Sequence, residues 1–264
     1  MGAYIDVHCH LTGDDYAAVG GVGRVIENAK NAGVNLLIAS GYDLDSSYET
    51  AALCEKYDGV YFSAGFHPSE LHKYKDGDLD RLKSLCKHEK CVAVGEIGFD
   101  YHYDNNPTKE TQKEFFLKQM QFADELGLPV VLHSRDAAQD TLEFLKEHVS
   151  LLKKGGLLHC YSYSAEMLPE FEKLGFYFSF GGTSTFKNAN KVQASVRATP
   201  MEKILSETDC PYLTPVPHRG VFPNQPKNVT YVTENLAALL GWQANELETQ
   251  ILQNAKRLFF KIKE

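Results

Sequence analysis

The sequence of 264 residues has no run of 18 apolar residues, so no segment is predicted to cross a membrane as a helix. Its first residues, MGAYIDVHCH, lack the cationic stretch and the apolar core of a signal peptide. It has only six cysteines, and none of them form a C-x-x-C pair. We therefore expect a cytoplasmic protein with reduced thiols, without a disulfide framework and without a membrane partner.

Basic side chains are in the minority, because 27 Lys and Arg face 35 Asp and Glu and give a formal net charge of -8. A chain of this charge does not attract polyanions over long distances. The balance argues against a general nucleic-acid coat. Any work on nucleic acid needs local positive charge, which a few Lys and Arg side chains or bound metal ions supply.

Short apolar, β-branched runs alternate with longer amphipathic segments, which is typical of strand–helix units that carry a parallel sheet. Strands are expected near 4–9, 34–40, 59–66, 91–97, 129–133, 156–160, 176–180 and 203–209. Helices are expected near 21–32, 44–56, 78–88, 109–126, 136–147, 165–174, 189–198, 228–240 and 244–260. The alternation predicts one (β/α)8 TIM barrel domain over residues 1–264. An open doubly wound sheet is the alternative, weakened because no Gly-rich phosphate motif follows the first run.

The stretch 211–226, PYLTPVPHRGVFPNQP, holds five of the ten prolines. Proline lacks a backbone donor and fixes φ, so this stretch is not expected to form a regular helix or a central strand. We expect a stiff, extended connection after the eighth strand. It is either a wall over a barrel mouth or an ordinary long surface loop.

Side chains that bind metal ions follow the predicted strands at their carboxyl ends. Taken singly, each has an ordinary explanation as a polar surface or core residue. Parallel strands of a barrel bring their carboxyl ends to one face, so all of them are expected to converge there. Four imidazoles and two carboxylates suit one or two divalent ions with positions left open for water. The six residues are His8, His10, Glu96, His133, His159 and Asp209.

The first of these ions is expected between the first and last strands. His8 and His10 lie two apart in one strand, so both rings face the same side. They are expected to chelate one ion together with Asp209 from the adjoining eighth strand.

A second ion is expected at His133 and His159, which end neighbouring strands. Glu96 is expected to lie between the two ions, and its two carboxylate oxygens are expected to bridge them. Bridged ions in hydrolytic two-metal sites lie about 3.5–4 Å apart.

Other polar groups near the same rim have predicted supporting roles. His67, in GFHP, is expected to hydrogen-bond an anionic substrate or to be a simple turn residue before Pro68. Arg135, in HSRDA, is expected to clamp a phosphate or to form an exposed ion pair.

Residues beside the ligands are expected to support them. Asp6 and Glu207 lie two positions before His8 and Asp209 and are expected to orient metal ligands. Cys9, Cys160 and Cys210 fall on the opposite parity where each strand continues, so they are interpreted as packing groups.

Several motifs occur in a fixed order along nearly the whole chain: IDVHCH, GFHP, GEIGFDYHYD, LPVVLHSRDA, LLHCYS, YFSFGGTSTFKNA and SETDCPYLTPVPHRG. Together they resemble the TatD-type metal-dependent deoxyribonucleases, within the wider amidohydrolase group of barrels. The resemblance implies a (β/α)8 barrel, a divalent-metal site and phosphodiester hydrolysis, often as a 3′-to-5′ exonuclease on DNA. It places the family's ligands on the same six residues and His67 near the substrate phosphate.

The chain departs from the usual family pattern at three places. It reads HCYSYS where family members commonly read HCFSGS, and it has Cys210 where ETDSPYL is common. The loop VFPNQP after Gly220 lacks a basic residue often found there. No departure touches a metal ligand, so these positions bear on substrate preference.

We predict a hydrolase that cleaves phosphodiester bonds of DNA, preferably single-stranded, with one or two Mg²⁺, Mn²⁺ or Zn²⁺ ions. Asp209 and Glu96 are the predicted catalytic carboxylates, with Asp209 as ligand and proton acceptor together. One alternative is a small-molecule amidohydrolase or phosphoesterase with the same metal centre. Another is a non-enzymatic nucleic-acid-binding barrel with a structural ion. No obligate protein partner is predicted.

Overall fold

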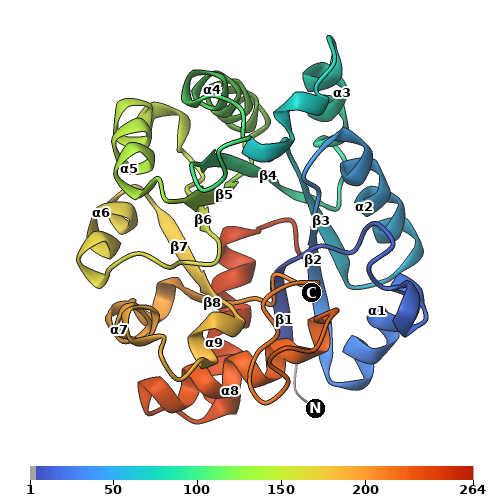
Figure 1. Cartoon of the computed structure of the whole chain (residues 1–264), viewed down its shortest axis with the longest axis vertical. Coiled ribbons are helices and arrows are strands. Elements are labelled where there is room, and N and C mark those ends of the chain that lie inside the picture. The colour runs from blue at the N-terminus through green and yellow to red at the C-terminus, as the bar shows by residue number, and fades with distance from the viewer. Residues whose placement is uncertain (1–3, 264) are drawn as a thin grey trace. The chain divides into compact units, whose positions relative to one another are not determined.

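The computed structural model describes residues 4–263. Strands and helices alternate along the chain, and the eight strands follow one another in the sheet in chain order (Figure 1). The strand pairs for which a register is defined are parallel. This is the strand order of the (β/α)8 fold, so the predicted fold class is confirmed over the doubly wound alternative.

The bounds of the elements follow the predicted alternation closely. The strands are β1 (Tyr4–Cys9), β2 (Val34–Ser40), β3 (Val60–Ala64), β4 (Cys91–Asp100), β5 (Val130–Arg135), β6 (Gly156–Leu158), β7 (Phe176–Phe180) and β8 (Ile204–Ser206). The helices are α1 (Gly21–Asn31), α2 (Leu44–Lys56), α3 (Asp78–Leu85), α4 (Lys109–Leu126), α5 (Ala138–Glu147), α6 (Leu168–Lys173), α7 (Asn190–Ala198), α8 (Val229–Leu240) and α9 (Ala244–Leu258). Among residues 4–263, no helix combines the length and the apolar character that a membrane crossing needs.

Five strand ends differ from the prediction, and three of these differences bear on the site. β4 continues to Asp100, whereas β6 and β8 end before His159 and Asp209. Cys160 and Asp209 have positive φ angles of 45° and 51°, so the chain turns directly after these two strands. The side-chain alternation of a strand therefore does not reach Cys160 or Cys210, and that argument for where these thiols point was wrong.

Residue contacts divide the chain into two compact units. The first comprises residues 4–39, 159–168 and 178–257 of the described chain, and the second comprises residues 40–158, 169–177 and 258–263. Both units contain strands and buried apolar side chains, and β2 and β7 each have residues in both. That the chain is a single domain stays a prediction.

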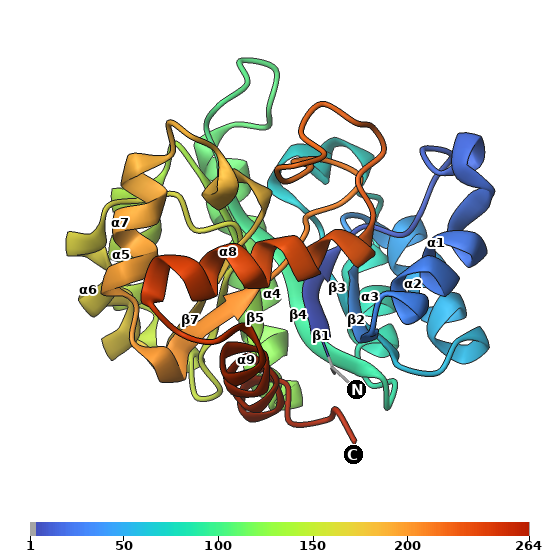
Figure 2. The ribbon, with the colours of Figure 1, turned by 90° about the horizontal axis from the view of Figure 1, so that it is seen from below.

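In the first unit, β1 pairs with β2 and β7 pairs with β8. β1 also lies beside β8, where the amide of Asp209 donates to the carbonyl of His8 at 3.0 Å. The first and last strands are therefore neighbours, as they are in a closed barrel sheet. Helix α8 packs against both of them and crosses in front of β1 in Figure 2.

In the second unit, β3, β4, β5 and β6 pair in sequence. Helix α4 shows how local sequence sets an element here. The Thr108 hydroxyl accepts a hydrogen bond from the Thr111 amide at 3.3 Å, and Gly127 ends the helix with a φ of 63°. Phe115 and Phe116 are buried, so the predicted apolar face of this helix is confirmed.

Helix α2 begins with a charged cap whose removal we expect to destabilise the protein. The Asp43 carboxylate accepts hydrogen bonds from the Ser46 amide at 2.8 Å and from Lys73 Nζ at 2.7 Å. Burial alone would raise the pKa of Asp43, but the bonds from Lys73 and Ser46 bring this pKa below its ordinary value. We expect Asp43→Ala to reduce the free energy of unfolding by about 1–2 kcal/mol at neutral pH, measured by urea denaturation.

The pH dependence of this loss follows from the lowered pKa. The cap stabilises the folded state only while Asp43 is ionised, so the loss should be complete above the ordinary pKa of Asp, about 4. It should fade as the pH drops through the still lower pKa of the folded state. Asp45→Ala, an exposed position in the same turn, is the control, and an equal loss in both variants would contradict the assignment.

Candidate metal centre

Four of the six predicted ligands lie together in the first unit. His8 is in β1, His10 follows β1, His159 follows β6 and Asp209 follows β8. The Nε2 atoms of His8 and His10 lie 3.7 and 3.5 Å from Asp209 Oδ1. The His8 ring stacks on that of His159, with 4.1 Å between the centroids. One donor atom from each of His8, His10 and Asp209 falls within 4.8 Å of the others. Two imidazoles and a carboxylate at this spacing suit a divalent cation.

Backbone hydrogen bonds between the ends of β1 and β8 position these donors. The amide of Asp209 donates to the carbonyl of His8, and the amide of His10 donates to the carbonyl of Cys210 at 2.7 Å. The Tyr16 hydroxyl donates to the carbonyl of His10 at 2.8 Å. Residues from opposite ends of the sequence therefore meet because the first and last strands are neighbours.

The Asp209 carboxyl group is held in its ionised form. Burial alone would raise its pKa, but the hydrogen bond with His10 and the nearby imidazoles of His159 and His8 bring the pKa of Asp209 below its ordinary value. An acid with a lowered pKa is a carboxylate at neutral pH. Metal binding and proton acceptance both require that form.

Glu207 lies buried beside His159. Its Oε1 accepts a hydrogen bond from the Cys160 amide at 2.7 Å, and its Oε2 accepts one from the Ser179 hydroxyl. The Nδ1 atom of His159 is 3.6 Å from Glu207 Oε1. These contacts fix the turn that carries His159, which supports the predicted orienting role of Glu207.

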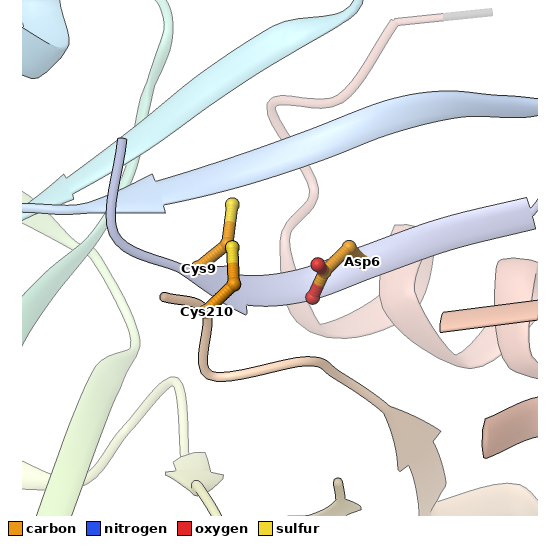
Figure 3. Close-up of side chains that lie close together, drawn as sticks. All are labelled: Asp6, Cys9 and Cys210. Atoms are coloured by element: carbon orange, nitrogen blue, oxygen red, sulfur yellow. The ribbon is translucent and has the colours of Figure 1, made fainter. Parts of the chain in front are cut away.

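Asp6 lies two positions before His8 in β1, near the thiols of Cys9 and Cys210. Figure 3 shows Cys9 and Cys210 side by side, with Asp6 farther back along β1. All three are buried, and one donor atom from each falls within 4.8 Å of the others. The Asp6 carboxylate accepts hydrogen bonds from the amide and the hydroxyl of Thr208, and the Cys9 thiol donates to the Ile38 carbonyl. The hydrogen bonds of Asp6 join β1 to Thr208, which directly precedes Asp209. His8, His10, His159 and Asp209 are called the first ligand group below.

The remaining two predicted ligands, Glu96 and His133, lie together in the second unit. Glu96 is in β4 and His133 in β5, with His133 Nδ1 2.8 Å from Glu96 Oε1. The other ring nitrogen of His133 is 3.0 Å from Asp100 Oδ2. His67, which follows β3, places Nε2 3.6 Å from Glu96 Oε1. A histidine that binds a metal ion through one ring nitrogen usually donates from the other to a carboxylate, and both Glu96 and Asp100 are placed to accept from His133.

Asp100 is a further candidate for the site, and it was not predicted from the sequence. One donor atom from each of His67, Asp100 and His133 falls within 4.8 Å of the others. Burial alone would raise the pKa of Asp100, but hydrogen bonds from His133 and from the His102 amide bring that pKa below its ordinary value. A signal for Asp100 was present, because it lies four positions after Glu96 on the same side of one strand. The predicted strand stopped at residue 97, so the parity argument did not reach it.

The two predicted substrate-binding residues have different surroundings. His67 Nδ1 accepts a hydrogen bond from the Ser69 amide at 3.1 Å. In the tautomer that accepts this bond, the proton of the neutral ring lies on Nε2, which is then a donor. Arg135 is exposed at the end of β5, and its guanidinium carbon lies 5.1 Å from the centroid of the Tyr103 ring.

Residues 5–260 match the family model described as TatD related DNase. The chain belongs to this family. It is 41% identical over 254 residues to YabD of Bacillus subtilis, described as an uncharacterized metal-dependent hydrolase, covering 96% of this chain and 98% of YabD. It is 40% identical over 256 residues to YcfH of Escherichia coli, described in the same words, covering 97% and 95% of the two chains.

A solved structure supports the same assignment. The crystal structure of YjjV, a TatD homolog from Escherichia coli, matches with a TM-score of 0.90 and 31% identity, covering 97% of this chain and 98% of YjjV. The protein is therefore a metal-dependent hydrolase of the TatD family with a (β/α)8 fold. The resemblance seen in the motifs is confirmed. The assignment of the six ligands to particular ions, including the bridge by Glu96, stays a prediction.

Proposed function

We propose that this TatD-family hydrolase cleaves phosphodiester bonds of DNA as a 3′-to-5′ exonuclease that prefers single strands. The family description supports DNA as the substrate class. The observation that carries the hydrolytic part is the placement of the His8, His10 and Asp209 donors within 4.8 Å of one another. This histidine and carboxylate set leaves coordination positions open, as hydrolytic rather than structural sites do.

The roles of the side chains follow from their positions. His8, His10 and Asp209 would hold one divalent ion, and Glu96 and His133 would take part in holding a second. Such ions, when bound, lower the pKa of a bound water to near neutral pH and neutralise negative charge on the phosphate. Asp209, already ionised, accepts the proton of the attacking water.

His67 and Arg135 bind the phosphate in this proposal. His67 donates a hydrogen bond to the phosphate from Nε2, because its Nδ1 atom accepts a hydrogen bond from the Ser69 amide. Arg135 offers an exposed guanidinium, whose fork of N–H donors matches the oxygens of a phosphate.

The direct test is a substrate screen of the wild-type protein with Mg²⁺, Mn²⁺ and Zn²⁺ in turn. Substrates are a 5′-labelled single-stranded DNA, its duplex, the same sequence as RNA, and simple esters and amides. We expect the single-stranded DNA to be shortened one nucleotide at a time from its 3′ end, and phosphorothioate linkages at that end to block the reaction. Hydrolysis of esters or amides with all strands intact would establish the small-molecule alternative, and internal cuts would refute the exonuclease mode.

A further inference from the structure

The loop between β8 and α8 carries an exposed apolar patch that the proposed chemistry does not use. Four of its side chains are about half exposed or more: Tyr212 at 56%, Val216 at 46%, Val221 at 58% and Phe222 at 59%. The loop rises above the start of α8 in Figure 2. Large apolar side chains gathered at the surface indicate a binding surface. Val221 and Phe222 belong to the VFPNQP segment, where the resemblance leads one to expect a basic residue.

Hydrogen bonds fix the course of this loop and join it to Asp209 of the first ligand group. The amide of Tyr212 donates to the carbonyl of Asp209 at 3.1 Å. Asn224 is buried, and its side-chain amide donates to the carbonyls of Thr208 and Tyr212. The Thr214 hydroxyl donates to the carbonyl of Val221 at 2.6 Å. The patch is therefore held in place before anything binds, which lowers the entropic cost of binding.

The two aromatic rings of the patch form a pair with accessible faces. The rings of Tyr212 and Phe222 are 6.3 Å apart between centroids and are tilted by 39°. Tyr212 lies three positions after Asp209, so their Cα atoms are at most about 11 Å apart. The aromatic pair therefore starts on the turn that carries a predicted metal ligand, and we expect nucleotides that flank the reacting phosphate to pass near it.

The charge of this loop suits a polyanion, although the whole chain is acidic. No Asp or Glu occurs between Asp209 and Glu234, whereas Arg219 and Lys227 do. Arg219 is exposed, and its guanidinium carbon lies 4.0 Å from the centroid of the Phe186 ring. The loop therefore supplies the local positive charge that work on nucleic acid requires of this chain.

From these observations we infer that Tyr212 and Phe222 form a stacking platform for the bases of single-stranded DNA, with Arg219 of the same loop available to the strand's phosphates. The inference rests on the proposed function. Aromatic rings with adjacent cations are the surface on which single strands stack, without a requirement for sequence. A second copy of the chain fits less well, because a stable dimer buries about 800 Å² on each partner and four partly exposed side chains offer roughly half of that.

The test compares Phe222→Ala with wild type on two strands of equal length, one with all its bases and one with abasic sites throughout. Phe222→Ala should raise KM for the base-bearing strand by roughly five- to a hundredfold and leave kcat within about twofold. It should leave hydrolysis of the abasic strand unchanged. Phe222→Trp should restore the wild-type KM, and Phe260→Ala, at another half-exposed phenylalanine, should have no effect.

Three other outcomes would contradict either the stacking platform or the proposed function. If wild type cleaves the DNA and Phe222→Ala leaves KM unchanged, the platform is refuted while the proposed function stands. If Phe222→Ala instead converts a wild-type dimer into monomers with KM unchanged, the patch is a contact between copies and the platform is again refuted. If wild type cleaves neither strand, the proposed function fails and the platform fails with it.

Discussion

Replacing Asp209 by Asn should reduce kcat for DNA hydrolysis by at least about a hundredfold while KM changes by less than about threefold. Asn keeps the size of the side chain and one oxygen, but it neither carries the charge nor accepts the proton of the attacking water. The charge is present in the native protein because His10, His159 and His8 hold the pKa of Asp209 below its ordinary value. Steady-state kinetics on single-stranded DNA at saturating Mn²⁺ measure both constants.

Asp15→Asn is the matched control for this substitution. Asp15 is an exposed acid in the same unit, and its loss should leave both constants unchanged. An Asp209→Asn variant with the wild-type turnover number at saturating metal would refute the role of Asp209 as proton acceptor.

Replacing Glu96 by Gln should be the second severe change, and it should act through metal binding. The Glu96 carboxylate lies 2.8 Å from His133 Nδ1 and 3.6 Å from His67 Nε2, and it is buried. Removing its charge takes from the proposed bridging ligand the negative oxygen that divalent ions prefer. We expect kcat/KM to fall by about a hundredfold or more at limiting metal and to recover in part when the metal concentration is raised.

Metal content and kinetics together test this expectation. Inductively coupled plasma mass spectrometry of the purified variant should show fewer bound ions than wild type. Glu114→Gln is the control, because Glu114 is exposed and forms a 2.6 Å ion pair with Lys118, four positions further along the same helix. Unchanged metal content in Glu96→Gln would show that Glu96 is not a ligand.

The fold was predictable because its signal is repeated along the whole chain. Eight apolar runs alternate with amphipathic segments, and each amphipathic helix needs a sheet face to bury its apolar side. In α4 the same sequence that marks the apolar face also supplies the caps, since Thr108 precedes it and Gly127 ends it. Local and long-range signals agree there, so the element was located well.

The grouping of the ligands was predictable in part, and its limits are physical. His8, His10 and Asp209 come together because the order of parallel strands makes β1 and β8 neighbours. Asp100 was missed because glycine and polar residues near a strand end obscure where the strand stops, and β4 runs on past the predicted end. The stacking of His159 on His8 was not predictable, because it depends on the turn after β6 rather than on any strand.

The exposed platform lay beyond what the sequence alone indicates. The five prolines of residues 211–226 correctly excluded a regular α-helix or strand, since the structure has neither over this stretch. They did not reveal that Tyr212 and Phe222 lie at the surface as a pair, because that depends on the hydrogen bonds of the buried Asn224 side chain. A loop's course is set by such individual contacts rather than by a repeating pattern.

The central claim is that hydrolysis of single-stranded DNA by this protein depends on divalent ions. These ions are proposed to bind the first ligand group and the pair of Glu96 and His133. The most direct measurement removes all metal with a chelator, confirms the removal by mass spectrometry, and follows cleavage of a labelled strand as Mn²⁺ is added back. We predict no cleavage by the metal-free protein and a rate that rises to a plateau at about one or two equivalents of metal per chain. A metal-free protein that cleaves the strand at the full rate would contradict the claim.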